Sequence, residues 1–138
     1  MNIKNKVGQL VKKYGTNNPF EIAKALGIEV VFEPLGDSHG YFSRFNRTTI
    51  IHINESLPYE KQVTTSAHEL GHVVLHPDIN TAFLKANTLY STDKIELEAN
   101  EFMLELLFNY GGDQSITAHE ATEHYGIPEQ MLCKNFYP

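Results

Sequence analysis

Residues 64–76 read Thr-Thr-Ser-Ala-His-Glu-Leu-Gly-His-Val-Val-Leu-His, and this stretch decides how the rest of the chain is interpreted. It contains the pattern His68-Glu69-x-x-His72. Because residues four apart lie on one face of an α-helix, His68 and His72 can present both imidazoles to one metal ion. Glu69 adjoins His68 and can reach a water molecule in the open position of that metal. The stretch therefore predicts a helix with two metal ligands and a general base.

The surrounding residues favour a helix that begins near residues 54–58 and ends at about His76, because Pro77 cannot continue it. Apolar residues recur there at helical spacing: Val63, Ala67, Leu70, Val74 and Leu75. Gly71 costs about 1 kcal/mol relative to Ala in mid-helix, so we expect a second helix or a peptide to pass close to it. Two surface histidines could share this spacing by coincidence, but the apolar context favours the metal site.

Composition sets broad limits on the protein class. The chain has 138 residues, 41% of them hydrophobic, which is most economically one domain over residues 1–138. Its net charge is −6 and it has no basic run, which argues against nucleic acid as the main partner. No apolar stretch approaches membrane-spanning length and no signal peptide is evident, so we expect a cytoplasmic protein that does not contact membranes. Cys133 is the only cysteine and cannot form an intramolecular disulfide.

The order of expected elements indicates an α+β fold. Helices are expected at residues 3–14, 19–26, 94–109, 117–125 and 128–136, strands at 28–33, 41–45 and 48–53, and an irregular loop at 77–93. The three strands are joined by short connections, so an antiparallel meander is the economical topology. His52 alternates with apolar neighbours along the third strand, which is more typical of a structural or exposed histidine than of a metal ligand.

A catalytic zinc usually has a third protein ligand, and the helix expected after Asp93 offers four carboxylates. Three of them share one stripe that is most simply solvated: Glu98, Glu101 and Glu105. Glu96 lies about 200° away from Glu98 on the helix, on a mostly apolar and inward stripe. An inward carboxylate needs a partner, so we favour Glu96 over Glu98 as the third ligand. Asn100, one turn later, is equally consistent with a surface amide and with a hydrogen-bond partner of a ligand histidine.

These motifs, taken together, resemble the ImmA/IrrE family of metallo-endopeptidases, which are gluzincin-like. The resemblance rests on four stretches: Pro19-Phe-Glu-Ile-Ala-Lys-Ala-Leu-Gly-Ile28, Gly40-Tyr-Phe42, His68-Glu-Leu-Gly-His72, and Glu96-x-x-Ala99-Asn100-x-Phe102 with Leu106-Leu107. It implies a zincin-like α+β fold with a small sheet beside the metal-site helix. It also implies a link to mobile elements of Gram-positive bacteria and cleavage of a helix-turn-helix repressor. Met103 and Leu107-Phe108-Asn109 depart from the family pattern, and the second departure concerns the helix end.

The expected chemistry is zinc-assisted hydrolysis of a peptide bond, with Glu69 accepting the proton of the attacking water. A second donor to the oxyanion is expected, and Tyr41, His76 and Tyr90 are candidates. His76 is more simply a histidine favoured by the helix C-terminus. A substrate peptide is expected to add a strand to an exposed sheet edge, although the sequence does not indicate which strand forms that edge.

Two functions are consistent with this pattern. One is an endopeptidase specific for one protein, a helix-turn-helix repressor of a phage or integrative element. The basic surface of such a repressor would be attracted to this acidic chain. The alternative is a zinc-binding sensor or regulatory module of the same fold with little or no proteolytic activity.

Overall fold

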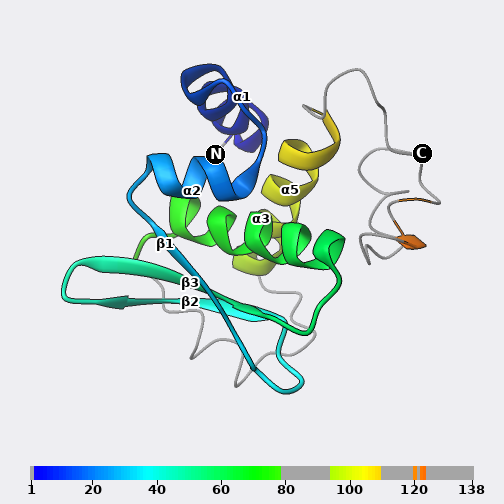
Figure 1. Cartoon of the computed structure of the whole chain (residues 1–138). Coiled ribbons are helices and arrows are strands. Elements are labelled where there is room, and N and C mark those ends of the chain that lie inside the picture. Colours follow the sequence, from blue (N-terminus) through cyan, green and yellow to red (C-terminus); the bar gives the residue numbers. More distant parts are fainter. Residues whose placement is uncertain (1, 79–93, 110–119, 121, 124–138) are drawn as a thin grey trace.

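The computed structural model describes residues 2–78, 94–109, 120, 122 and 123, and its described part is an α+β arrangement, as expected (Figure 1). Its elements are α1 (Ile3–Tyr14), α2 (Pro19–Ala25), β1 (Glu29–Glu33), β2 (Gly40–Phe45), β3 (Thr48–Asn54), α3 (Tyr59–Leu75), α5 (Lys94–Leu104) and a π-helical turn, η1 (Glu105–Asn109). The expected loop after Asp78, the helix expected at 128–136, Tyr90 and Cys133 fall outside the described residues, and of the helix expected at 117–125 only residues 120, 122 and 123 are described, as helical.

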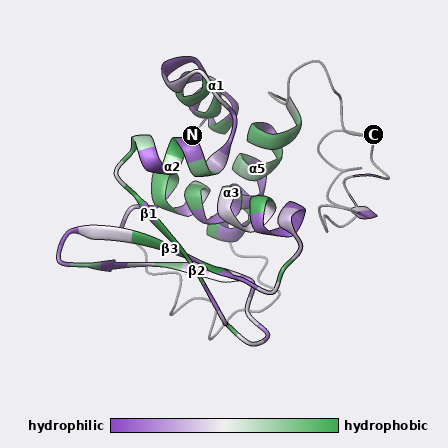
Figure 2. Ribbon diagram, in the orientation of Figure 1, coloured by the Kyte–Doolittle hydropathy of each residue, from purple (hydrophilic) through white to green (hydrophobic). Residues whose placement is uncertain are grey.

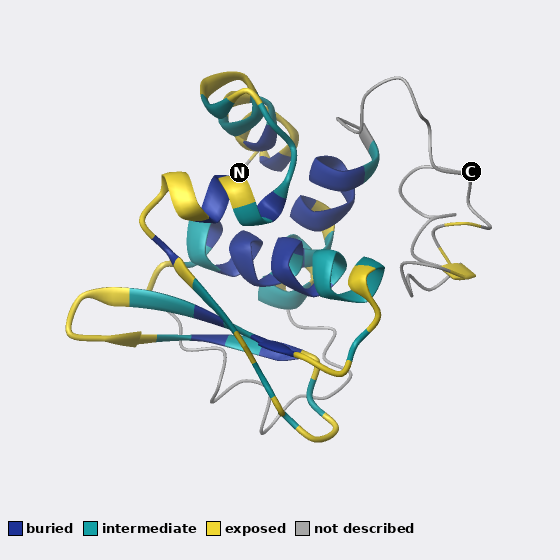
Figure 3. Cartoon of the chain, viewed as in Figure 1, coloured by how far each residue is buried: buried dark blue, intermediate teal, exposed yellow. Residues whose placement is uncertain are grey.

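The helices cover one face of the sheet, and α3 lies between the sheet and the other helices (Figure 1). Hydrophobic residues recur along α3 and α5 (Figure 2), and buried residues gather on these two helices and on β3 (Figure 3). Fully buried side chains from three elements illustrate this core: Ile51, Leu70 and Phe102. The metal-site helix is therefore held from both sides.

Within the described ranges, no helix has the length and apolar character to cross a membrane.

Local sequence signals place the helix ends where they were expected. Asn18 begins α2, and its side-chain oxygen accepts hydrogen bonds from the backbone N–H groups of Phe20 (2.9 Å) and Glu21 (3.4 Å). Pro19 occupies the first helical position, where its missing N–H costs nothing. Helix α3 ends at Leu75, and its C-cap residue His76 stands immediately before Pro77. Helix α5 passes into the π-helical turn η1, which coincides with the departure from the family pattern at residues 107–109.

The predicted antiparallel meander is wrong in one pairing. The strand order is β1-β3-β2, so β3 is central, antiparallel to β2 but parallel to β1. Ile51 and Ile53 of β3 are fully buried, whereas β1 carries Glu29 and Glu33 at its ends. A central strand is protected on both edges and charged residues protect an exposed edge, so this order suits the composition of the strands.

Asn54, the last residue of β3, stabilises the crossing that this strand order requires. Its amide nitrogen donates to the carbonyls of Gly36 (3.0 Å) and Ser38 (2.9 Å) in the connection from β1 to β2. Its side-chain oxygen accepts from the backbone N–H and the hydroxyl of Ser56, just before α3. The same 3%-exposed side chain therefore anchors both the crossing loop and the entry to the metal-site helix.

Two glycines allow close approaches to α3. A Cβ on Gly71 would lie 3.1 Å from three atoms of the Phe102 side chain on α5, which is the packing reason expected for a mid-helix glycine. A Cβ on Gly40 in β2 would lie 2.5 Å from the carbonyl oxygen of His52 and 2.7 Å from Cγ2 of Thr65. The first approach brings α5 against α3, and the second brings β2 against it.

We predict that Gly40→Ala lowers the free energy of unfolding by about 1–3 kcal/mol, because the backbone carbonyl of His52 cannot move without breaking the sheet. Gly71→Ala is the matched control. There the Phe102 ring can shift, and Ala gains about 1 kcal/mol of helix propensity, so the net change should be smaller. Urea unfolding measures both values. A Gly40→Ala variant as stable as the parent would contradict the close approach of β2 to α3.

Candidate metal centre

Three side chains from two helices converge at one point. His68 and His72 project from α3, with their Nε2 atoms 3.2 Å apart. Glu96, in the first turn of α5, approaches from the other helix. Its Oε2 lies 3.0 Å from Nε2 of His68, and its Oε1 lies 2.9 Å from Nε2 of His72. The structure thus brings together the two histidines and the carboxylate that the sequence singled out.

The spacing and chemistry of these donors fit a zinc ion. Two imidazole nitrogens and one carboxylate form a donor set that zinc favours in catalytic sites. A tetrahedral zinc with bonds of about 2.0–2.1 Å separates its ligand atoms by about 3.3 Å. The three contacts of 2.9–3.2 Å are close to that separation. Small movements of these side chains would accommodate the ion.

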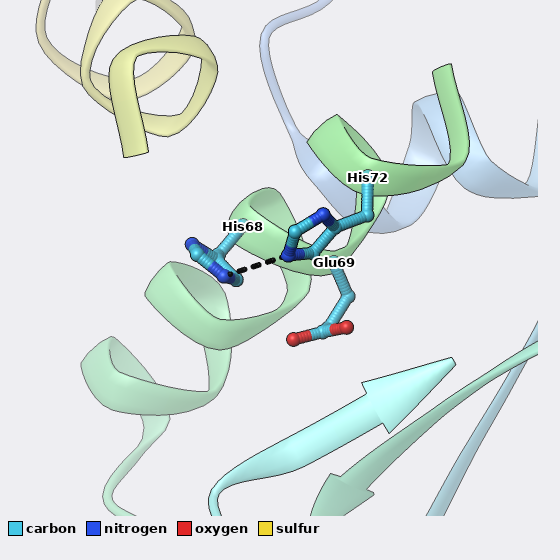
Figure 4. Close-up of side chains that lie close together, drawn as sticks. All are labelled: His68, Glu69 and His72. Carbon is cyan, nitrogen blue, oxygen red and sulfur yellow. Dashed lines mark hydrogen bonds between the residues drawn. The ribbon is translucent and has the colours of Figure 1, made fainter. Parts of the chain in front are cut away.

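Glu69 lies on the same helix, beside the two histidines but oriented differently. Figure 4 shows its side chain extending from α3 toward the strands, while the rings of His68 and His72 meet edge to face. Ligand atoms of Glu69, His68 and His72 all lie within 4.8 Å of one another, so these three also form a geometric metal-binding group. Glu96 is the better placed candidate for a third ligand, because its oxygens lie 2.9–3.0 Å from the two Nε2 atoms. Glu69 is fully buried beside them.

The surroundings of Glu96 keep it ionised. Burial by itself would raise the pKa of this carboxyl, but its hydrogen bonds with His68 and His72 lower the pKa far below its usual range. A carboxylate in the first turn of a helix is also favoured by the helix dipole. His72 is fully buried, and its Nδ1 has no hydrogen-bond partner within the described part of the chain. Asn100 makes no hydrogen bond to His68 or His72 among those residues.

The interpretation of Glu98 as part of a solvated stripe is wrong. Its side chain is only 15% exposed, and its Oε1 lies 3.3 Å from Nε2 of His76 at the end of α3. Glu105 is also buried, at the start of the π-helical turn, so only Glu101 of the three lies in solvent. A helical wheel of α5 shows only α5 itself. It does not show the C-terminal end of α3, which covers Glu98 in the structure. The His76–Glu98 pair therefore forms a second link between the two helices, next to the metal centre.

The candidates for the oxyanion donor now have defined surroundings. Tyr41 lies on the sheet face opposite α3, because its neighbours Gly40 and Phe42 face the helix. Its ring stacks on His52, with centroids 4.3 Å apart. The ring of His76 lies 6.2 Å from that of His72 and pairs with Glu98. Of the candidates within the described residues, His76 is thus the one beside the metal centre.

His52 has a structural role, as its strand position suggested. Its Nε2 is 2.9 Å from the hydroxyl of Ser43, and its Nδ1 is 2.7 Å from Oε1 of Glu33. The three residues come from three strands and cross the sheet face that is turned away from α3. Alternation along each strand could have placed them on one face, but only the observed register shows that they touch.

Comparison with known proteins identifies the family. Residues 23–137 match the model of the IrrE N-terminal-like domain, a family of peptidases. The chain belongs to the ImmA/IrrE family. It is 44% identical over 108 residues to uncharacterized immunity region protein 2 of Bacillus phage phi105, and 37% identical over 107 residues to metallopeptidase ImmA of Bacillus subtilis. Each match covers 76% of this chain, but 67% and 62% of the relatives, so the chain spans about two thirds of their length. Membership of this metallopeptidase family implies a metal cofactor.

We predict that Glu96→Gln weakens zinc binding by at least about 100-fold, because even residues that only support ligands contribute 10–100-fold. Glu98→Gln is the matched control on the same helix and should change zinc affinity by a few-fold at most, since Glu98 contacts His76. Competition with a chromophoric chelator measures both constants. The opposite order of effects would assign the third ligand to Glu98.

Proposed function

We propose that this chain is a zinc-dependent endopeptidase that cuts a specific protein, a helix-turn-helix repressor of a phage or integrative element. The proposal treats residues 1–138 as one zincin-like domain that acts in the cytoplasm. One observation carries the enzymatic part: His68, His72 and Glu96 converge, with the buried carboxylate of Glu69 beside them. The names of the two relatives, an immunity region protein and a metallopeptidase, support a role in phage immunity.

In this mechanism His68, His72 and Glu96 would hold the zinc, which when bound supplies a water of lowered pKa, near about 7, and polarises the scissile carbonyl. Glu69 accepts the proton of the attacking water and passes it to the nitrogen of the leaving amine. Its complete burial keeps bulk water away from this transfer. His76, held by Glu98, is the residue that we assign to donate a hydrogen bond to the developing oxyanion.

The edge of β2 is the substrate edge that this proposal requires. In the described sheet, β2 and β1 each pair only with β3, so both present an unpaired backbone edge. Only β2 is close to the metal centre, because Phe42 packs 6.3 Å from the ring of His72 and Gly40 contacts Thr65, one turn before Glu69. A substrate segment that pairs with β2 would place its backbone beside Glu69.

A zinc-binding sensor is the second candidate, and the same donor set would serve it. The position of Glu69 favours the enzyme, because a buried carboxylate beside such a donor set is suited to act as a general base. Buried ionisable groups also concentrate at catalytic sites.

We predict that Glu69→Gln retains zinc but slows hydrolysis of the substrate by at least about 100-fold, because only proton transfer is lost. The substrate to use is the helix-turn-helix repressor encoded beside the gene, with an unrelated basic protein as the control. Gel analysis with and without chelator follows the cleavage.

Selective, chelator-sensitive cleavage by the parent and none by Glu69→Gln would support the enzyme. Near-normal turnover by the variant would refute the assigned base, and equal digestion of both proteins would refute the selectivity. Stable binding of the repressor without any cleavage would instead favour the sensor.

A further inference from the structure

The tip of the β2–β3 hairpin concentrates positive charge in an acidic protein. The chain contains two arginines, Arg44 and Arg47, and both are exposed at this tip. Between them, Phe45 has 71% of its surface exposed. The sequence from Ser38 to Asn54 contains no aspartate or glutamate, although the whole chain has a net charge of −6. The hairpin extends sideways beyond the helices that cover the sheet, so the tip is accessible (Figure 1).

The backbone of the tip is left-handed at Asn46 and Arg47. Asn46 and Arg47 form the two-residue turn, with φ values of 50° and 68°. Such turns require left-handed backbone at both positions, where asparagine followed by glycine is favoured. A side chain at the second position is strained, and strain of this kind is a reason to look for function. An arginine therefore stands at a position where glycine would be less strained.

The tip continues the edge that adjoins the metal centre. Phe42 is the residue of β2 that lies beside His72 of α3. Phe45 lies three residues farther along β2, a distance of about 10 Å. An extended segment paired with β2 would meet the arginines about two to five residues from the bond placed at the metal. Backbone hydrogen bonds along β2 would hold the segment, and the tip would select its side chains.

We propose that Arg44, Phe45 and Arg47 form a distal subsite that binds an acidic residue beside an apolar one in an extended segment of the substrate protein. This inference rests on the proposed function. Arginine and an aromatic anchor are typical of protein contacts. Two arginines are few for nucleic acid, because proteins commonly contact about 6–10 phosphates. A protein segment is therefore the better occupant.

The test compares cleavage profiles on a peptide library made from a proteome digest with blocked amines. Zinc-loaded parent protein and the R44E/R47E variant are incubated with it, and mass spectrometry identifies the new termini. The parent should enrich Asp and Glu at one position about two to five residues from the cut. The variant should lose this enrichment by about fivefold, the upper range for an exposed ion pair. Identical profiles would overturn the subsite.

Two further variants separate this role from a structural one. K4E/K6E makes the same charge change at exposed positions of α1, on the side of α3 away from the sheet, and should keep the parent profile. Arg47→Gly relieves the left-handed strain, so it should raise the urea midpoint of unfolding while it weakens the preference for acidic residues. A gain in stability with an unchanged preference would contradict a binding role for Arg47.

A binding measurement keeps the inference testable if the parent makes no chelator-sensitive cut in the library, and the proposed function is then judged by cleavage of the repressor alone. Uncut library peptides are then passed over immobilised Glu69→Gln protein, with and without R44E/R47E. Arginine-dependent retention of acidic peptides would support the subsite, and equal retention would overturn it. A short DNA duplex is titrated in parallel. Arginine-dependent binding of DNA without a preference for acidic peptides would overturn the assignment to a protein segment.

Discussion

The contact of the Glu96 carboxylate with His68 and His72 is the interaction on which the rest of the structure depends. It joins Glu96 to residues 28 and 24 positions earlier in the chain and requires α5 to lie directly against α3. That approach is possible because Gly71 leaves room for Phe102 and because His76 and Glu98 form a second link between the same helices. A side chain at position 71 would press on Phe102 of α5, so the packing of the two helices and the geometry of the metal centre are coupled.

The sheet meets the metal-site helix from the opposite side through a similar approach. Gly40 lets β2 lie against Thr65, which places the edge of β2 beside the buried Glu69. Asn54 supports this arrangement by holding both the loop that leads into β2 and the turn that leads into α3. The catalytic base that we propose and the substrate edge are thus positioned by backbone contacts with little freedom to shift. The hairpin extends that same edge to the positively charged tip.

Sequence reasoning succeeded where the signal is local and failed where it depends on a distant partner. The spacing of His68 and His72, the Asn18 cap and the stop at Pro77 each act within one helix, and each element was found where expected. The parallel pairing of β1 with β3 could not be found, because a short connection is compatible with either strand order. Glu98 was misplaced for a related reason, since a helical wheel shows which residues share a face but not what covers that face.

X-ray absorption at the zinc edge of the zinc-loaded protein tests the central claim most directly, because it reports the atoms bound to the metal. The account predicts two imidazole nitrogens and two oxygens, one from Glu96 and one from water, at about 2.0–2.2 Å. The Glu96→Gln variant should lose or alter one of the oxygen contacts while its two imidazoles remain. A sulfur contact at about 2.3 Å, which would indicate Cys133, or a spectrum with fewer than two imidazoles would contradict the account.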